Sequence, residues 1–258
     1  MPHATILGLS GCSSSGKTTL SRLLRAVFPH AFVLHEDDFY KPEESLPFRD
    51  GLRDWDCAAS IDMDGLQAAL RYVHENGTLP PWLDSKEDQN EAGPSGVDPA
   101  LVERLSTEVR QWASQDAGKR VLRAEKPLAI LDGFLLFGES VKAGVRTSID
   151  IKILLRANYA KAKERREGRS GYVTLEGFWK DPPGYVDRVV WPNYVEEHGF
   201  LFEGGDVEGS VNEKVASELR LYSGSQVTGA RQYAPQIANG CLLTIAQKRR
   251  GIAETQSC

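Results

Sequence analysis

The sequence predicts an α/β fold in which helices flank a parallel sheet. Short apolar segments alternate along the chain with segments whose apolar residues recur at helical spacing, which is the order expected when helices join parallel strands. Residues 128–132 (Leu-Ala-Ile-Leu-Asp) are apolar up to the final acid, as in a strand covered on both faces. A loop rich in glycine and serine separates the first apolar segment from the first helical one.

The first elements follow from this pattern. Residues 5–10 are predicted to form a buried strand. Residues 17–27 are predicted to form a helix, because leucine and valine recur there at helical spacing. Pro29 ends this helix, since proline cannot continue the hydrogen-bond ladder. Residues 31–35 are expected to form the second strand, so a strand, a loop, a helix and a strand open the chain.

The later elements continue the alternation. Helices are expected over residues 63–74 and 99–112, and strands over residues 128–132 and 149–155. A weaker strand is expected at residues 200–203. Strands that alternate with helices imply a parallel sheet with right-handed crossovers.

The chain has 258 residues, and one α/β domain is expected over residues 1–222. An exposed insertion is expected at about residues 76–126, because its first part is rich in Gly, Pro, Asp and Glu. A small lid is expected at about residues 163–185. Residues 223–258 mix Gly, Ser, Gln and Ala and are expected to form an ordered appendage or a flexible tail.

Composition excludes several classes of partner. The net charge of −5 and the pI of about 5.6 disfavour a general nucleic-acid binder, which needs a basic face. The four cysteines are scattered and indicate free thiols in a reducing compartment. No apolar run approaches the roughly 18 residues of a membrane span, and no signal peptide is recognised. The protein is expected in the cytosol, or also in the nucleus, and the sequence leaves its oligomeric state open.

A phosphate-binding loop is the most specific motif. Residues 11–18 (Gly-Cys-Ser-Ser-Ser-Gly-Lys-Thr) fit G-x-x-x-x-G-K-[ST] at every fixed position and lie between a predicted strand and a predicted helix. Lys17 is expected to lie along the β and γ phosphates, and the Thr18 hydroxyl to hold Mg²⁺. The alternative is a Gly/Ser turn that matches by accident. The motif residues expected to bind a nucleoside triphosphate are Gly11, Ser13, Ser14, Ser15, Gly16, Lys17 and Thr18.

An acid after the second strand is the candidate general base. Ligands bind beyond the carboxyl ends of strands in open parallel sheets, so Asp37 is expected beside the γ-phosphate. A carboxylate there can take the proton of an attacking hydroxyl, or orient Mg²⁺ through water. The alternative is an acid that caps a helix or faces solvent. The loop and this acid together predict a P-loop NTPase fold and a kinase that phosphorylates a small-molecule hydroxyl.

Asp56 and Asp132 are two further candidate site residues. Trp55 and Asp56 could stack on a planar base and hold a ribose diol, although a core tryptophan beside a surface acid is the commoner arrangement. Asp132 closes the third strand and matches the second magnesium-orienting carboxylate of P-loop enzymes; the alternative is a turn-forming Asp-Gly.

A basic segment over residues 161–169 follows the fourth strand. Arginines on a lid can close over phosphates and neutralise the charge that develops during transfer. A helix with solvated basic residues is an equally good interpretation. The proline-rich turn at residues 181–185 could be a lid hinge or the end of the lid.

Together these segments resemble the nicotinamide riboside kinases, a branch of the uridine kinase-like P-loop kinases, over about residues 4–210. The matching strings are the phosphate loop with its second threonine, Asp-Asp-Phe-Tyr-Lys-Pro at 37–42, Trp55-Asp56, Asp-Gly-Phe-Leu-Leu-Phe at 132–137, the Arg-rich start of the lid, Pro183-Gly-Tyr185 and Trp191-Pro192. The resemblance implies ATP- and Mg²⁺-dependent phosphorylation of the ribose 5′-hydroxyl of nicotinamide riboside, giving nicotinamide mononucleotide for NAD synthesis.

The resemblance also implies roles for individual residues. Asp37 would be the general base and would contact the ribose, with Lys17 as the second catalytic residue. Substrate contacts would come from Asp37, Asp38, Tyr40, Trp55, Asp56, Arg166 and Tyr172. ATP contacts outside residues 11–18 would come from Thr19, Arg165 and Arg169. Magnesium would be held by Thr18, Asp37 and Asp132.

The sequence departs from the family pattern at four places. Asp132 stands where the family commonly has Glu, and Trp55 where it often has Tyr. The insertion at 76–126 and the lid segment between Arg169 and Asp181 are longer than in compact members.

Three alternatives are weighed against this reading. A uridine/cytidine kinase, or another small-molecule P-loop kinase such as one for pantothenate, would share the phosphate loop and the acid after the second strand. A P-loop GTPase is disfavoured because no N-K-x-D is present. A catalytically dead scaffold would not need Lys17, Thr18, Asp37 and Asp132 together.

Overall fold

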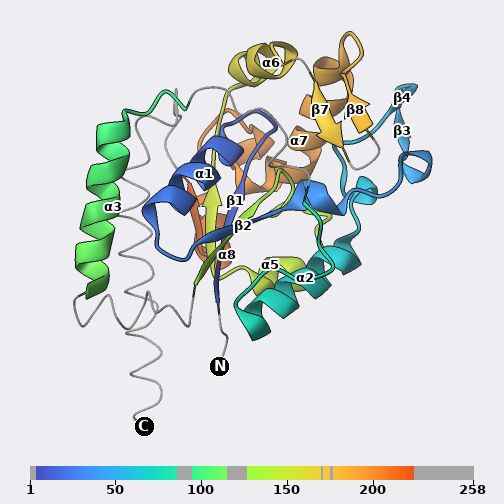
Figure 1. The fold of residues 1–258 in the computed structure, drawn as a ribbon. Coiled ribbons are helices and arrows are strands. Elements are labelled where there is room, and N and C mark those ends of the chain that lie inside the picture. Colours follow the sequence, from blue (N-terminus) through green and yellow to red (C-terminus); the bar gives the residue numbers. More distant parts are fainter. Residues whose placement is uncertain (1–3, 86–94, 115–126, 170, 175–176, 224–258) are drawn as a thin grey trace.

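The computed structural model describes residues 4–85, 95–114, 127–169, 171–174 and 177–223 (Figure 1). A five-stranded parallel sheet forms its centre, in the strand order β2-β5-β1-β6-β9. The α/β fold with a parallel sheet flanked by helices is therefore confirmed. The strands of the sheet are β1 (Thr5–Ser10), β2 (Phe32–His35), β5 (Leu128–Asp132), β6 (Ile151–Leu154) and β9 (Leu221–Ser223).

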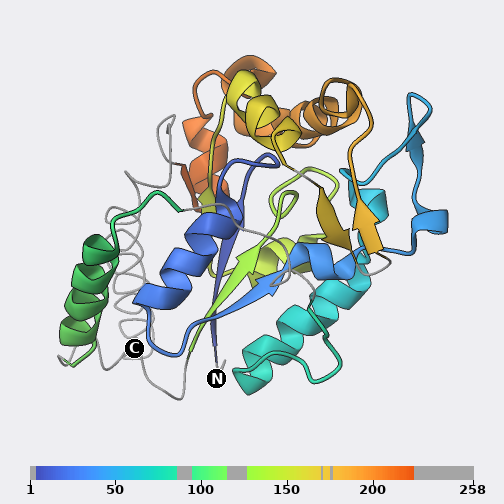
Figure 2. The same ribbon diagram turned by 45° about the horizontal axis from the view of Figure 1, so that its top comes forward.

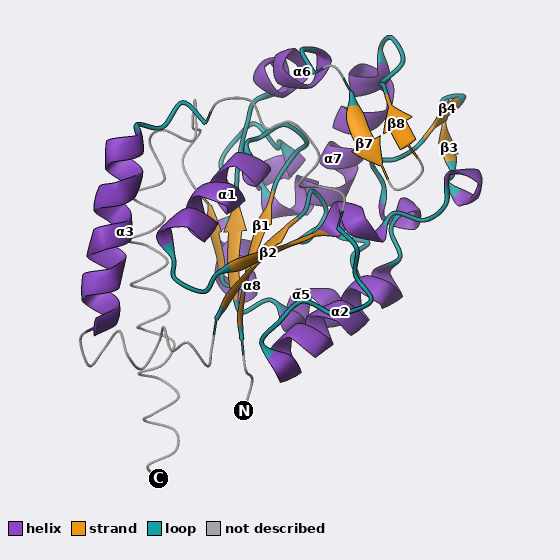
Figure 3. Ribbon diagram, viewed as in Figure 1, coloured by secondary structure: helices purple, strands orange, loops and turns teal. Residues whose placement is uncertain are grey.

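Helices cover both faces of the sheet, as Figure 3 shows. Side chains alternate along β1, so that Ile6 packs on one face and Leu7 on the other. The face of Leu7 is covered by α1 (Lys17–Val27) and α3 (Pro99–Ser114). The face of Ile6 is covered by α2 (Met63–Asn76), α5 (Ala143–Ser148), α7 (Trp191–His198) and α8 (Glu213–Leu219).

Smaller elements gather over the carboxyl end of the sheet (Figure 2). They include α6 (Tyr159–Glu167) and two antiparallel hairpins, one made by β3 (Phe48–Arg49) and β4 (Leu52–Arg53), the other by β7 (Tyr172–Thr174) and β8 (Gly177–Trp179). The 3₁₀ segments are η1 (Glu36–Phe39), η2 (Glu43–Ser45), η3 (Ala58–Ser60), η6 (Gly199–Leu201) and η7 (Glu203–Gly205). A π-helical turn, η5 (Val186–Val190), leads into α7.

The strongest sequence predictions agree with the structure. The first strand and first helix have the predicted bounds, 5–10 and 17–27, and the strand at 128–132 is also confirmed. The helix predicted at 99–112 is α3, which packs on α1 through Leu105 and Val109. Of the predicted insertion and tail, residues 86–94, 115–126 and 224–258 lie outside the described residues.

The prediction of a strand at residues 200–203 was wrong. Residues 200 and 201 lie in the 3₁₀ turn η6 and residue 203 begins η7, while Phe202 between them makes only an isolated bridge, to Val211. Glycines at 199, 204 and 205 surround the apolar residues, and the last two have positive φ, so the chain turns instead of extending. The fifth strand is β9, whose single buried residue, Leu221, gives too short a pattern to recognise.

No helix in the described part of the chain has the length and apolarity needed to cross a membrane.

Candidate active site

The phosphate loop is shaped by close backbone approach. Gly11 has φ 144°, and a Cβ there would lie 2.1 Å from the carbonyl oxygen of Leu155. Gly16 has φ 103° and immediately precedes α1. At position 11 only glycine tolerates both the positive φ and the close approach of the Leu155 carbonyl oxygen. The loop therefore passes tightly over the end of β6 and presents the N-terminus of α1 to the solvent side, where backbone N–H groups can bind anionic oxygens.

Lys17 is held inside this loop. Its side chain is 8% exposed, and its Nζ donates a hydrogen bond to the carbonyl oxygen of Cys12 at 3.1 Å. The lysine is thus folded back over the same backbone that would surround a phosphate.

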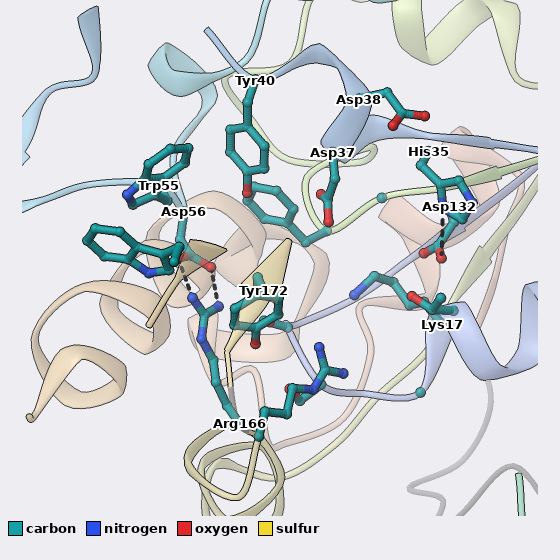
Figure 4. A pocket seen from close by; sticks show the side chains of 18 of the residues that line it. Lys17, His35, Asp37, Asp38, Tyr40, Trp55, Asp56, Asp132, Arg166 and Tyr172 are labelled. Carbon is teal, nitrogen blue, oxygen red and sulfur yellow. Dashed lines mark hydrogen bonds and ion pairs between the residues drawn. The ribbon is translucent and has the colours of Figure 1, made fainter. Parts of the chain in front are cut away.

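An open cleft, with an empty volume of about 990 Å³, joins the phosphate loop to the segment after β4 and to the β7–β8 hairpin. Figure 4 shows Lys17, His35 and Asp132 on one side of it and Trp55, Asp56 and Arg166 on the other, with Asp37 between them. Of the predicted site residues, all but Gly11, Ser15 and Arg165 line this cleft. Those that do are Ser13, Ser14, Gly16, Lys17, Thr18, Thr19, Asp37, Asp38, Tyr40, Trp55, Asp56, Asp132, Arg166, Arg169 and Tyr172.

Asp132 supplies a buried, ionised carboxylate beside the loop. It is 5% exposed, and its Oδ2 lies 3.6 Å from His35 Nδ1 and 3.5 Å from Ser21 Oγ. Burial favours the neutral acid, but hydrogen bonding by His35 and the charge of Lys17 outweigh this effect and lower the pKa of Asp132. His35 and Asp132 are opposite each other in the β2–β5 register, which brings these two side chains together.

This region suits Mg²⁺. The hydroxyl of Thr18 interacts with the Asp132 carboxylate, so both oxygens face one place, and oxygen is the ligand type that Mg²⁺ prefers. The described residues contain no group of three or more His, Cys, Asp or Glu side chains able to hold a metal ion.

The acids after β2 lie on η1. Asp37 is partly buried and lines the cleft. Asp38 also lines it, but its Oδ1 accepts a hydrogen bond from Ser85 Oγ at 3.0 Å, and in Figure 4 its carboxylate is turned away from Tyr40. Of the two adjacent acids, Asp37 is the one placed between the phosphate loop and the acceptor side.

A hydrogen-bonded frame holds the segment that carries Trp55 and Asp56. Asn193 on α7 donates to both carboxylate oxygens of Asp54 at 2.9 Å. The hydroxyl of Tyr185 accepts from the N–H of Trp55 at 2.9 Å and donates to the carbonyl oxygen of Arg53 at 3.1 Å. Because these partners lie more than 100 residues further along the chain, the tertiary fold fixes the local backbone.

Asp56 and Arg166 bind one another in this structure. Arg166 donates to the two carboxylate oxygens of Asp56 at 2.7 and 3.0 Å, and to Asp181 at 2.6 and 3.2 Å. Burial works against the charge of Arg166, but the Asp56 and Asp181 carboxylates raise its pKa above the ordinary value. The two predicted substrate contacts are thus brought together as one buried ion pair with Asp181 as a third member.

Of the other two lid arginines, Arg169 lines the cleft and Arg165 contacts the phosphate loop. Arg165 donates to the carbonyl oxygen of Ser14 at 3.3 Å, which ties α6 to the phosphate loop. Arg169 lies over the ring of Tyr172, 5.2 Å from its centroid. The ATP contacts expected of these two arginines stay a prediction.

An exchange of Asp56 for asparagine tests the acceptor side. Hydrogen bonds to charged groups contribute about 1.5–3 kcal/mol, so we expect Asp56→Asn to raise, about 10- to 100-fold, the KM for the nucleoside substrate that the sequence predicts. The KM for ATP should change little, because residues 11–18 are untouched. Steady-state kinetics with each substrate varied in turn measures both constants; an unchanged nucleoside KM would remove Asp56 from the acceptor pocket.

Sequence reasoning missed several residues of the cleft. His35, Phe134 and Trp179 line it, and Asp181 was interpreted only as part of a turn. Pairing of the second and third predicted strands could have pointed to His35, since it ends β2 directly before the acids. No sequence signal pointed to Trp179.

Comparison with known proteins gives one consistent family. The chain is 38% identical over 209 residues to the nicotinamide riboside kinase of Schizosaccharomyces pombe, covering 81% of this chain and 85% of that protein. It is 33% identical over 220 residues to the nicotinamide riboside kinase of Saccharomyces cerevisiae, covering 84% and 87%. Human nicotinamide riboside kinase 1 is 27% identical over 192 residues, covering 74% and 75%.

Solved structures give a more distant likeness, and no protein-family model matches the chain. A possible uridine kinase from Bacillus stearothermophilus is 17% identical, with a TM-score of 0.39 over 76% of this chain and 83% of that one. A putative fructose transport system kinase from Silicibacter is 20% identical, with a TM-score of 0.38 over 64% and 71%.

Proposed function

The chain belongs to the nicotinamide riboside kinase family, and we propose that it transfers the γ-phosphate of ATP to the ribose 5′-hydroxyl of nicotinamide riboside. The product would be nicotinamide mononucleotide. The observation that carries the proposal is one shared cleft, in which the phosphate loop faces Trp55 and Asp56 after β4 and the aromatic residues of the β7–β8 hairpin. A donor nucleotide and an acceptor nucleoside can meet only in such a shared space.

On the donor side, the loop backbone and the N-terminus of α1 bind the phosphates. Lys17 leaves the carbonyl of Cys12 and places its charge along the β and γ phosphates. Arg169 adds a second positive charge from the lid. Thr18 and Asp132 would hold Mg²⁺, with Asp37 acting through water. The ion neutralises phosphate charge when it is bound.

On the acceptor side, Asp37 accepts the proton of the 5′-hydroxyl as the oxygen attacks the γ-phosphorus in line. Asp56 accepts hydrogen bonds from the ribose hydroxyls. Arg166 is oriented by Asp181 and can keep that partner when the substrate takes over one of its bonds to Asp56. The aromatic residues of the cleft contact the base.

The test is phosphorylation of nicotinamide riboside and uridine, measured side by side with ATP and Mg²⁺. We expect a kcat/KM for nicotinamide riboside that exceeds the value for uridine, because the pocket is aromatic and acidic and the pyridinium ring is cationic. A preference for uridine would retain the phosphate-transfer mechanism and overturn the assignment of the acceptor. Turnover of neither nucleoside would overturn the proposed function.

A further inference from the structure

We propose that Trp179 is a specificity-determining residue that favours a cationic aromatic base over a neutral one. It lies at the end of β8, in the β7–β8 hairpin. The inference deepens the proposed function and rests on it, since it concerns the base of the same acceptor nucleoside. With Trp55, the residue forms a wall of the cleft, called here the indole wall.

The indole wall is a continuous aromatic surface. The ring centroids of Trp55 and Trp179 are 5.3 Å apart, with an angle of 48° between the ring planes. Trp55 in turn meets Tyr40 edge-on at 5.3 Å, and Tyr40 stacks on Phe134 at 6.3 Å. All four side chains line the cleft. A planar ring that enters the cleft therefore meets aromatic side chains contributed by three loop segments and by the β7–β8 hairpin.

Trp179 is fixed in this orientation. Its Nε1–H donates a hydrogen bond to Asp181 Oδ1 at 2.9 Å, and its ring packs edge-on against Tyr185 at 6.1 Å. The neighbouring residue of the strand, Phe178, points the other way and is 64% exposed, as alternation along a strand requires. The side chain of Trp179 is thus directed to the cleft by the pleat and anchored there at its polar end.

The anchor connects the indole wall to a group of charges with an excess of negative charge. Asp181 accepts from both Trp179 and Arg166, and Arg166 is paired with Asp56. Two carboxylates and one guanidinium leave one negative charge in excess when both acids are ionised. All three are buried or nearly so, with side-chain exposures of 5%, 16% and 6% for Asp56, Asp181 and Arg166. A cation near these groups is stabilised more strongly than it would be in water.

The aromatic wall and the excess negative charge both favour a cationic base. A pyridinium ring is attracted to the electron-rich face of an indole and to the excess carboxylate. A uracil ring of similar size retains the stacking contact but gains nothing from the charge. The contribution of Trp179 should therefore appear as selectivity between the two nucleosides, and not only as general affinity.

The experiment compares the wild-type protein with Trp179→Leu and Trp179→Phe in full-length form. For Trp179→Leu we expect the KM for nicotinamide riboside to rise about five- to thirtyfold, the range that a cation–π contact supplies between an exposed and a desolvated site. The KM for uridine should rise less, and the KM for ATP should stay unchanged. Trp179→Phe keeps an aromatic face but loses the bond to Asp181. Its selectivity for nicotinamide riboside over uridine should therefore fall between that of the wild type and that of Trp179→Leu.

Phe178→Leu is the matched control, because it shortens an aromatic side chain on the same hairpin that points to solvent. It should leave the ratio of the two kcat/KM values unchanged. If Trp179→Leu and Trp179→Phe both keep the wild-type ratio, or lose activity equally on both nucleosides, the inference is overturned and Trp179 is only a structural part of the lid. Wild-type preference for uridine would instead overturn the proposed function. The variants therefore test the role of Trp179, whereas the wild-type protein tests the proposed function.

Discussion

Replacement of Asp37 by asparagine is expected to lower kcat by about 10²- to 10⁴-fold, the usual contribution of a general base. Asparagine has nearly the same shape but cannot take the proton of the attacking hydroxyl. Asp37 lies on η1, immediately beyond β2, and lines the cleft between Lys17 and the acceptor side (Figure 4). The KM for ATP should change little, because the phosphate loop is intact.

Single-turnover measurement of product formation with saturating ATP and nicotinamide riboside separates this chemical step from product release. Asp64→Asn is the control, since Asp64 is an exposed acid in the first turn of α2 that pairs with Lys142 on the surface. It should behave as the wild type. If Asp37→Asn turned over at a near-normal rate, Asp37 would not be the general base.

Replacement of Lys17 by methionine is expected to lower kcat/KM for ATP by at least about 10²- to 10³-fold, the effect of removing one preorganised donor from a transition state. Lys17 is buried, and its ammonium is the loop side chain expected to reach the transferring phosphate. Methionine fills a similar volume, so the phosphate loop should still fold. Both the binding of ATP and the chemical step should weaken.

Lys142→Met is the matched control, because Lys142 is half-exposed and its partner, Asp64, is on the surface. Thermal melting of both variants checks that folding is retained. An ATP kcat/KM within a few-fold of wild type for Lys17→Met would contradict the position assigned to the ammonium group along the phosphates.

The sequence predicted the strand and the helix around the phosphate loop well because their signals are local. The phosphate loop is one continuous motif, and its flanking strand and helix are set by apolar spacing, so β1 and α1 have the predicted bounds. Asp37 and Asp132 follow from a general rule about the carboxyl ends of parallel strands. Their strands are neighbours in the sheet.

The acceptor side was less predictable because its contacts join distant parts of the chain. Asp56 and Arg166 are 110 residues apart, and a sequence pattern does not indicate that two candidate substrate contacts will pair with each other. Trp179 depends on a hairpin in which only three residues pair on each strand, too few for alternation to be recognised. Strand β9 escaped detection for the same reason.

The distribution of the cleft residues along the chain has a consequence for how such an enzyme can change. The phosphate loop joins β1 to α1 and Asp132 ends β5, and both strands lie inside the sheet, whereas Trp55, Tyr172 and Trp179 lie on peripheral loops and hairpins. Substitutions in the periphery can alter which nucleoside is accepted without disturbing the packing of the central strands. On the proposed function, the choice of nucleoside and the transfer of phosphate depend on separate parts of the chain, so the first can be redesigned in the laboratory while the phosphate loop is left unchanged.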